Sequence, residues 1–146
     1  MSINRVLASG RVSYPARIIE SDDGAVCVRW GFVTWGPRRN RLTGDWENFP
    51  NYLDCAMFGP RARAVSKLLK RNRQFVLDGR FQWNKWKDPH GRDLSKLQVV
   101  VLNIDDADYL SGRRASEPPL TEANIRESAR SMADLPDGSI PVDTAL

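Results

Sequence analysis

Residues 52–83 read Tyr-Leu-Asp-Cys-Ala-Met-Phe, Gly-Pro, Arg-Ala-Arg-Ala-Val-Ser-Lys-Leu-Leu-Lys-Arg, Asn-Arg and Gln-Phe-Val-Leu-Asp-Gly-Arg-Phe-Gln-Trp. The first segment, 52–58, has the aromatic and apolar content of a strand and stops at Gly59-Pro60. In residues 61–71, four apolar side chains recur at helical spacing between basic ones: Ala64, Val65, Leu68 and Leu69. Segment 74–83 is strand-like again. The stretch therefore predicts one short amphipathic helix between two strands.

Two strand-like segments precede this stretch and one follows it. Residues 5–12 predict a first strand that continues after Tyr14-Pro15 into 16–20, and Gly10 permits a bend or a close backbone approach within it. After a turn at 21–24, residues 25–35 predict a second strand that pairs back as a hairpin. Residues 97–104 predict the last strand. Residues 36–50 are polar and rich in turn formers, which predicts a loop with a basic rim.

The resulting order, β-β-β-α-β-β, indicates the fold class. Five strands with one helix between the third and the fourth are the layout of the OB-fold, a five-stranded Greek-key barrel that often binds oligonucleotides on one face. We therefore expect an all-β barrel with one short helix over residues 1–110. Residues 111–146 lack the strand pattern, and we expect a linker and a mildly acidic, mostly disordered, flexible C-terminal tail with one short helix over 121–133.

Charge is unevenly distributed along the 146 residues. Residues 1–112 carry 18 basic and 12 acidic side chains, whereas residues 113–146 carry 4 and 6, and the net charge is +4. A basic body attracts polyanions. The single histidine, His90, lies in a predicted turn, and neither Cys27 nor Cys55 has the spacing of a metal or redox motif. We expect buried thiols, no metal, no cofactor and no enzymatic activity.

Neither membrane attachment nor export is expected. No apolar run approaches the ~20 residues that span a bilayer. The chain starts Met-Ser-Ile-Asn-Arg, which lacks the apolar core of a signal peptide. We therefore expect a cytoplasmic protein.

One short segment alternates tryptophan with lysine. Residues 81–91 read Phe-Gln-Trp-Asn-Lys-Trp-Lys-Asp-Pro-His-Gly, a strand entering a turn. An indole such as that of Trp86 can stack on any nucleobase, which contributes ~1–3 kcal/mol per base, while Lys85 and Lys87 can reach phosphates. Trp83 lies three residues earlier and so on the opposite strand face if the strand is regular, which leaves a stacking and a structural role both open.

The other tryptophans differ in their settings. Trp30, within a strand, is best explained as a core residue because burial of its large apolar surface stabilises the fold. Trp35, at a strand end beside a glycine, is a candidate for base stacking. Trp46, in the polar segment, either folds against the barrel or reaches a base. A basic cluster beside Trp35 favours phosphate contact: Arg38, Arg39 and Arg41.

Together these residues resemble the bacterial single-stranded DNA-binding proteins. The similarity covers residues 1–110. The motifs that carry it are Ile3-Asn4-Arg5-Val6, Ser9-Gly10-Arg11-Val12, Tyr52, Phe58-Gly59, Asp78-Gly79-Arg80-Phe81, and Lys85-Trp86-Lys87-Asp88 with Gly91.

The resemblance implies a nucleoid-associated homotetramer of OB-folds that binds single-stranded DNA without sequence specificity. Such proteins coat and protect the strand in replication, recombination and repair. By position, four residues match the family's stacking residues: Trp35, Tyr52, Phe58 and Trp86. The roles of Tyr52 and Phe58 rest on the resemblance alone.

The C-terminus departs from the family's pattern. Family members carry a long linker and an acidic tip ending Ile-Pro-Phe, which docks into replication and repair enzymes. Here the corresponding residues are Ile140, Pro141 and Val142, with fewer acids and four residues beyond them. A phage- or plasmid-borne paralogue would explain such divergence. Two alternatives remain open, an OB-fold protein-interaction subunit and an RNA-binding OB protein.

Overall fold

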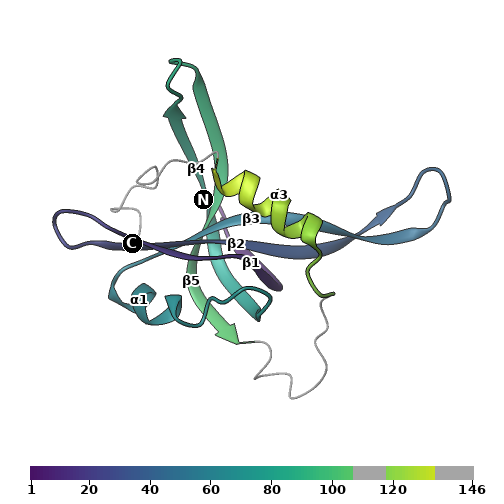
Figure 1. Ribbon diagram of the computed structural model, residues 1–146, viewed down its shortest axis with the longest axis horizontal. Coiled ribbons are helices and arrows are strands. Elements are labelled where there is room, and N and C mark those ends of the chain that lie inside the picture. The colour runs from purple at the N-terminus through teal and green to yellow at the C-terminus, as the bar shows by residue number, and fades with distance from the viewer. Residues whose placement is uncertain (107–117, 134–146) are drawn as a thin grey trace.

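The five strands form a closed barrel with the order β1-β2-β3-β5-β4, as the computed structural model shows for its described residues, 1–106 and 118–133 (Figure 1). The elements are β1 (Val6–Glu20), β2 (Val26–Arg39), β3 (Trp46–Phe58), α1 (Pro60–Ser66), β4 (Gln74–Lys87), β5 (Asp93–Asp106) and α3 (Glu122–Ala133). The predicted all-β barrel, with one helix between the third and fourth strands, is confirmed.

The barrel interior is filled by alternate residues of the strands. Trp30 and Phe32 of β2 are fully buried there, and Phe75 of β4 is 1% exposed, so the prediction that Trp30 is a core residue is confirmed. Gly10 of β1 lies where a Cβ atom would be 1.9 Å from the carbonyl oxygen of Val33, so only glycine allows the two strands to approach this closely.

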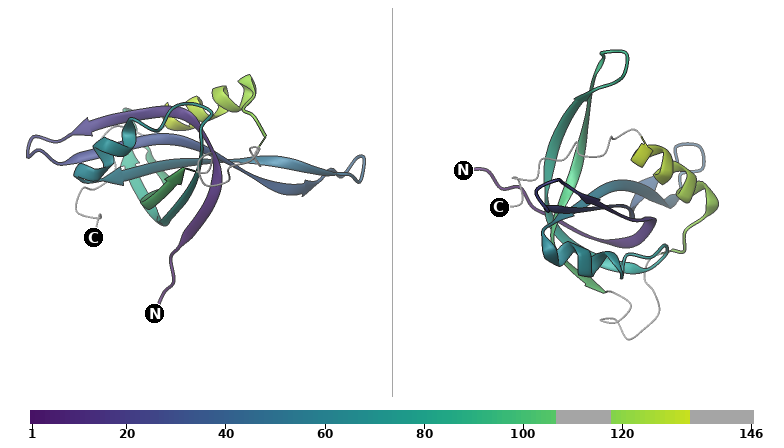
Figure 2. Two further views of the ribbon diagram at one scale, coloured as in Figure 1. Left: turned by 90° about the horizontal axis from the view of Figure 1, so that it is seen from below. Right: turned by 60° about the vertical axis from the view of Figure 1, so that its left-hand side comes forward.

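Two hairpins extend well beyond the barrel, which the sequence did not predict. Residues 36–50 were expected to be a loop, but β2 and β3 stay paired from Trp35↔Pro50 out to Arg39↔Trp46. β4 and β5 likewise pair out to Lys87↔Asp93. Most residues of these arms (Figures 1 and 2) are exposed, so their strands lack the apolar alternation that marks a half-buried strand.

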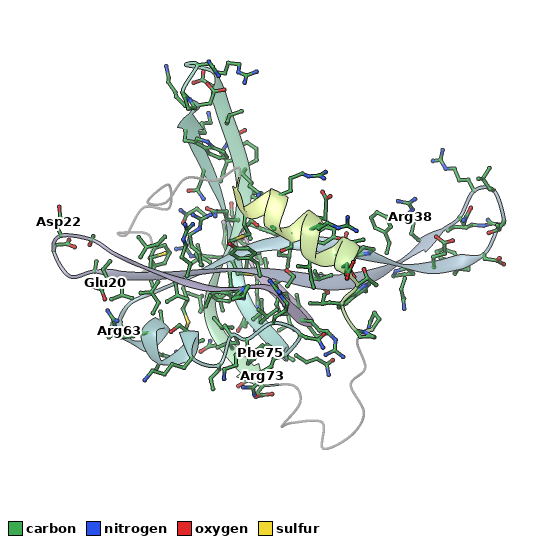
Figure 3. The ribbon with its side chains drawn as sticks, viewed as in Figure 1. Glu20, Asp22, Arg38, Arg63, Arg73 and Phe75 are labelled. Carbon is green, nitrogen blue, oxygen red and sulfur yellow. The ribbon has the colours of Figure 1, made fainter. Side chains whose placement is uncertain are left out.

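Helix α1 is shorter than the predicted range of 61–71. It ends at Ser66, and the chain then turns, with Leu69 donating its N–H to the Ser66 carbonyl and Asn72 at a positive φ of 74°. Leu69 is buried but Leu68 is 45% exposed, so the expected apolar face is only partly correct. Arg63 of α1 pairs with Glu20 of β1, which Figure 3 shows at the barrel's end.

The helix predicted over 121–133 is confirmed as α3, but its contact with the barrel was not predicted. It packs on the outside of the barrel against β1, β2 and β3. The division of the chain into a domain of residues 1–110 and a tail of 111–146 stays a prediction, because residues 107–117 and 134–146 lie outside the described ranges.

Neither thiol is poised for chemistry. Both cysteines are free and buried, as expected, and burial raises the pKa of Cys27 to about 11 and that of Cys55 well above its usual value. Within residues 1–106 and 118–133, no cluster of three or more His, Cys, Asp or Glu side chains could hold a metal. No helix in those ranges is long and apolar enough to cross a bilayer.

Candidate nucleic-acid interface

Strand register brings four predicted stacking residues to one face of the sheet. Trp30 and its partner Cys55 point into the core, as does Val99 beside Cys55. Because side chains alternate along a strand, the intervening residues of β2, β3, β5 and β4 face outward, and we call this surface the outer face. It includes the four aromatic residues Trp35, Tyr52, Phe58 and Trp86, each partly exposed.

The β2–β3 arm continues the outer face away from the barrel. Trp35 lies opposite Pro50, and further out Arg39 lies opposite Trp46, which is 70% exposed. Trp46 therefore reaches into solvent rather than folding against the barrel.

The three predicted phosphate-contacting arginines are divided between surfaces. Arg38 lies on the opposite face of the arm from Trp35, with its guanidinium 4.1 Å from the centre of the Phe49 ring; Figure 3 shows its position on the arm. Arg39 shares the face of Trp35, and Arg41 lies in the turn. All three nevertheless border one hollow at the end of the arm.

The β4–β5 arm separates its two tryptophans. Trp86, opposite Leu94, is on the outer face, whereas Trp83, opposite Leu97, is on the other face and 57% exposed. Lys85 and Lys87 alternate with Trp86 and so share the face of Trp83. Residues of both faces nevertheless border one hollow near the tip of the arm: Lys85, Trp86, Lys87, Asp93, Leu94 and Ser95.

An ion pair lies at the centre of the outer face. Asp54, next to Tyr52 on this face, has a side chain that is only 2% exposed and pairs with Lys96 of β5. Lys96 also donates to the backbone carbonyl and the hydroxyl of Ser131 in α3, at 2.5 and 2.7 Å. The Lys96 ammonium therefore neutralises the carboxylate, which would otherwise repel a polyanion at this point.

Sequence reasoning missed two features of this site. The Asp54–Lys96 pair joins residues 42 apart, and nothing in either local sequence indicates the partner. The position of α3 on the outer face was missed as well; the signal that could have found it is the apolar side of the helix, with Ile125, Ala129 and Met132.

Comparison with known proteins identifies the same fold and a family. The sequence model of the single-strand binding protein family matches residues 3–106. A protein of Borreliella burgdorferi named single-stranded DNA-binding protein is 28% identical over 103 residues, which are 70% of this chain and 68% of that one.

Solved structures share the barrel at low sequence identity. A complex of the Plasmodium falciparum protein with single-stranded DNA superposes with a TM-score of 0.66 at 15% identity, covering 74% of this chain and 97% of that one. A small single-stranded DNA-binding protein from Streptomyces coelicolor gives 0.57 at 17%, covering 73% and 95%. A deletion mutant of the Thermus aquaticus protein gives 0.61 at 18%; this match covers 82% of the present chain but 51% of the Thermus chain.

These similarities confirm the OB-fold and the resemblance noted from the sequence motifs. Proteins of this family are non-enzymatic DNA-binding proteins, in agreement with the absence of enzymatic activity expected from the sequence. The match spans all five strands and α1. The chain belongs to the single-strand binding protein family.

Proposed function

We propose that the protein binds single-stranded DNA without sequence specificity, on its outer face. The carrying observation is the strand register that gathers Trp35, Tyr52, Phe58 and Trp86 on that one surface from β2, β3 and β4. An aromatic ring stacks on any base at ~1–3 kcal/mol, so these rings supply affinity without reading sequence. Trp83 lies on the opposite face, and we leave it out of this stacking set.

The basic arms supply the phosphate contacts. The arginines at the end of the β2–β3 arm and the lysines at the end of the β4–β5 arm are exposed and flank the aromatic surface: Arg38, Arg39, Arg41, Lys85 and Lys87. Each phosphate that they neutralise releases condensed counterions. Affinity for a single strand therefore falls with salt, with a slope of about −0.7 per phosphate contacted.

Binding of this kind coats and protects the strand during replication, recombination and repair. A ligand that binds only unpaired DNA shifts the equilibrium of a hairpin toward its open form by mass action, so neither ATP nor a catalytic residue is needed. We place the protein in the cytoplasm, at the nucleoid, on the strength of this activity.

The opposite face of the β4–β5 arm suits contact between copies of the chain. Phe81, Trp83 and Leu97 share that face and are 39%, 57% and 48% exposed. Neighbouring exposed apolar side chains of this size are typical of protein interfaces. We propose that this strip contributes to the homotetramer implied by the family.

The C-terminal residues Ile140, Pro141 and Val142, proposed to meet replication or repair proteins, lie outside the described ranges. Deleting residues 134–146 while keeping α3 should leave DNA affinity unchanged and abolish such recruitment. A loss of DNA affinity in this variant would contradict a purely recruiting role for the tip.

Titration of the protein with oligo(dT), duplex DNA and oligo(U) tests the function, with intrinsic tryptophan fluorescence as the readout at low and moderate salt. We expect strong quenching by oligo(dT), weaker quenching by oligo(U) than by oligo(dT), and little quenching by duplex DNA. Preference for oligo(U) would favour the RNA-binding alternative. The absence of quenching by all three polymers would favour the protein-interaction alternative.

A further inference from the structure

Helix α3 lies across the middle of the outer face. Along β3, the outward residues run Pro50, Tyr52, Asp54, Ala56 and Phe58, and α3 contacts the second and third of them. In Figure 1 the helix crosses in front of the barrel between the two arms, and in the turned view of Figure 2 it again lies on the sheet beside β2 and β3.

Side chains hold the helix there from end to end. Asn124 donates its amide N–H to the Tyr52 hydroxyl at 3.0 Å, while its oxygen accepts from the N–H of Thr121, the residue just before the helix. At the other end, Ser131 donates to the Asp54 carboxylate at 3.4 Å and accepts from Lys96 at 2.7 Å. The contacts thus involve one proposed stacking residue and the ion pair beside it.

Between these ends, the helix fits a notch in the sheet. The Ser128 and Ser13 hydroxyl oxygens are 2.6 Å apart, and both residues are buried. The notch exists because residue 31 is glycine: a Cβ atom there would lie 2.4 Å from the Ser128 oxygen and 2.9 Å from the Ser13 oxygen. The sheet and helix surfaces are therefore complementary at this contact.

The helix occupies space that a strand stacked along the outer face would need. Pro50 to Phe58 spans about 26 Å at 3.3 Å per residue. A helix with its side chains is about 10–12 Å wide and so covers the central part of that length. A strand that stacks on Trp35 at one side and on Phe58 or Trp86 at the other must pass the place that α3 occupies.

We propose that α3 is a displaceable cover of the outer face, so that the docked helix and single-stranded DNA exclude one another at Tyr52. The inference rests on the proposed function. The described helix carries two acidic and two basic residues, Glu122, Glu127, Arg126 and Arg130, so its net charge is zero and it competes by occupying the surface rather than by mimicking a polyanion. The apparent dissociation constant then equals the intrinsic one divided by the fraction of molecules with the helix released.

A reversible covalent lock tests this directly. The oxygens of Ser13 and Ser128 are near enough for a Ser13→Cys/Ser128→Cys pair to form a disulfide, whose sulfurs lie ~2 Å apart. The native Cys27 and Cys55 are 7% and 0% exposed and stay out of the reaction. The two single-cysteine variants, treated with the same oxidant, serve as controls.

Anisotropy of a labelled oligo(dT) reports affinity without relying on tryptophan. We expect the oxidised double variant to bind at least ~10-fold more weakly than its reduced form, with affinity restored by reductant, while the single variants do not change. Equal affinity of the oxidised and reduced forms, within twofold, would overturn the proposal. If neither form nor the wild-type protein binds oligo(dT), the proposed function itself fails, which is a different result.

A second pair of variants tests release, and it decides the matter if the lock fails to close or the double variant fails to fold. Ser128→Gln adds three heavy atoms at a position that is 2% exposed, which should push the helix off the sheet. Ala123→Gln introduces the same glutamine at an exposed position of the same helix and serves as the control. Ser128→Gln should bind oligo(dT) at least ~3-fold more tightly than the wild type, and Ala123→Gln should not differ from it. Equal affinity of the two variants would contradict the proposal.

Discussion

Replacement of Trp86 by alanine is the sharpest single test of the outer face. Trp86 lies on the β4–β5 arm, away from both hydrophobic core clusters, so its removal should leave the barrel folded. Trp83 is on the same strand, three residues earlier and on the opposite face. Trp83→Ala removes the same kind of side chain from the other face, where Trp83 belongs to the proposed interface strip, so it serves as the control at equal assembly state.

The expected loss follows from the exposure of the ring. Stacking of one base on an aromatic side chain contributes ~1–3 kcal/mol. Trp86 is partly covered and borders a hollow shared with Lys96 and α3, so we place the loss at about 1–2 kcal/mol within that range. This corresponds to a dissociation constant that is about 5- to 30-fold higher.

The assay is anisotropy of labelled oligo(dT), with sedimentation to verify that both variants keep the wild-type assembly state. Trp86→Ala should lose about 1–2 kcal/mol of binding free energy. Trp83→Ala should weaken binding by less than about threefold, because a ring on the other face contributes no stacking. An unchanged affinity in Trp86→Ala, or an equal loss in both variants at unchanged mass, would refute the assignment of the outer face.

Three further predictions concern stability. Trp30→Ala should destabilise the barrel by about 3–5 kcal/mol in urea unfolding because it empties a fully buried site; a loss below 1 kcal/mol would contradict this. Lys96→Met should lower the free energy of unfolding by about 3 kcal/mol, since it leaves the buried Asp54 carboxylate without its cation. The double variant Lys96→Met/Asp54→Asn should regain part of this stability. A double variant no more stable than Lys96→Met would argue against the pair. The raised pKa of Cys27, about 11 against an ordinary 9.0, contributes stability that is fully present below pH 9 and lost between pH 9 and 11, because only the unfolded chain releases the proton there. Relative to Cys27→Ala, the wild type should therefore lose about 1 kcal/mol by pH 10, and parallel pH profiles would contradict the pKa.

The sequence was sufficient where burial creates a pattern. The runs around Trp30 and Val99 are apolar because they cross the core, and the helix after Gly59-Pro60 starts where proline is tolerated at the first turn. The arms gave no such signal. Residues 36–39 and 46–50 pair as strands outside the core, and a polar sequence with turn formers is then indistinguishable from a loop.

The residues of the candidate site could be proposed from the sequence, but their arrangement could not. Alternation along β4 separated Trp83 from Trp86 correctly, since that depends only on local geometry. Tyr52 and Phe58 came from the resemblance, and their place beside Trp35 needs the β2–β3 register. The seating of α3 on Gly31 depends on a contact between distant segments, which local sequence does not encode.

Photochemical cross-linking would test the central claim most directly. Oligo(dT) carrying 5-iodouracil, irradiated in the complex and analysed by tandem mass spectrometry, reports the aromatic side chains that lie against the bases. The account predicts cross-links to the outer-face residues Trp35, Tyr52, Phe58 and Trp86. Cross-links confined to Phe81 and Trp83, on the opposite face, would contradict it.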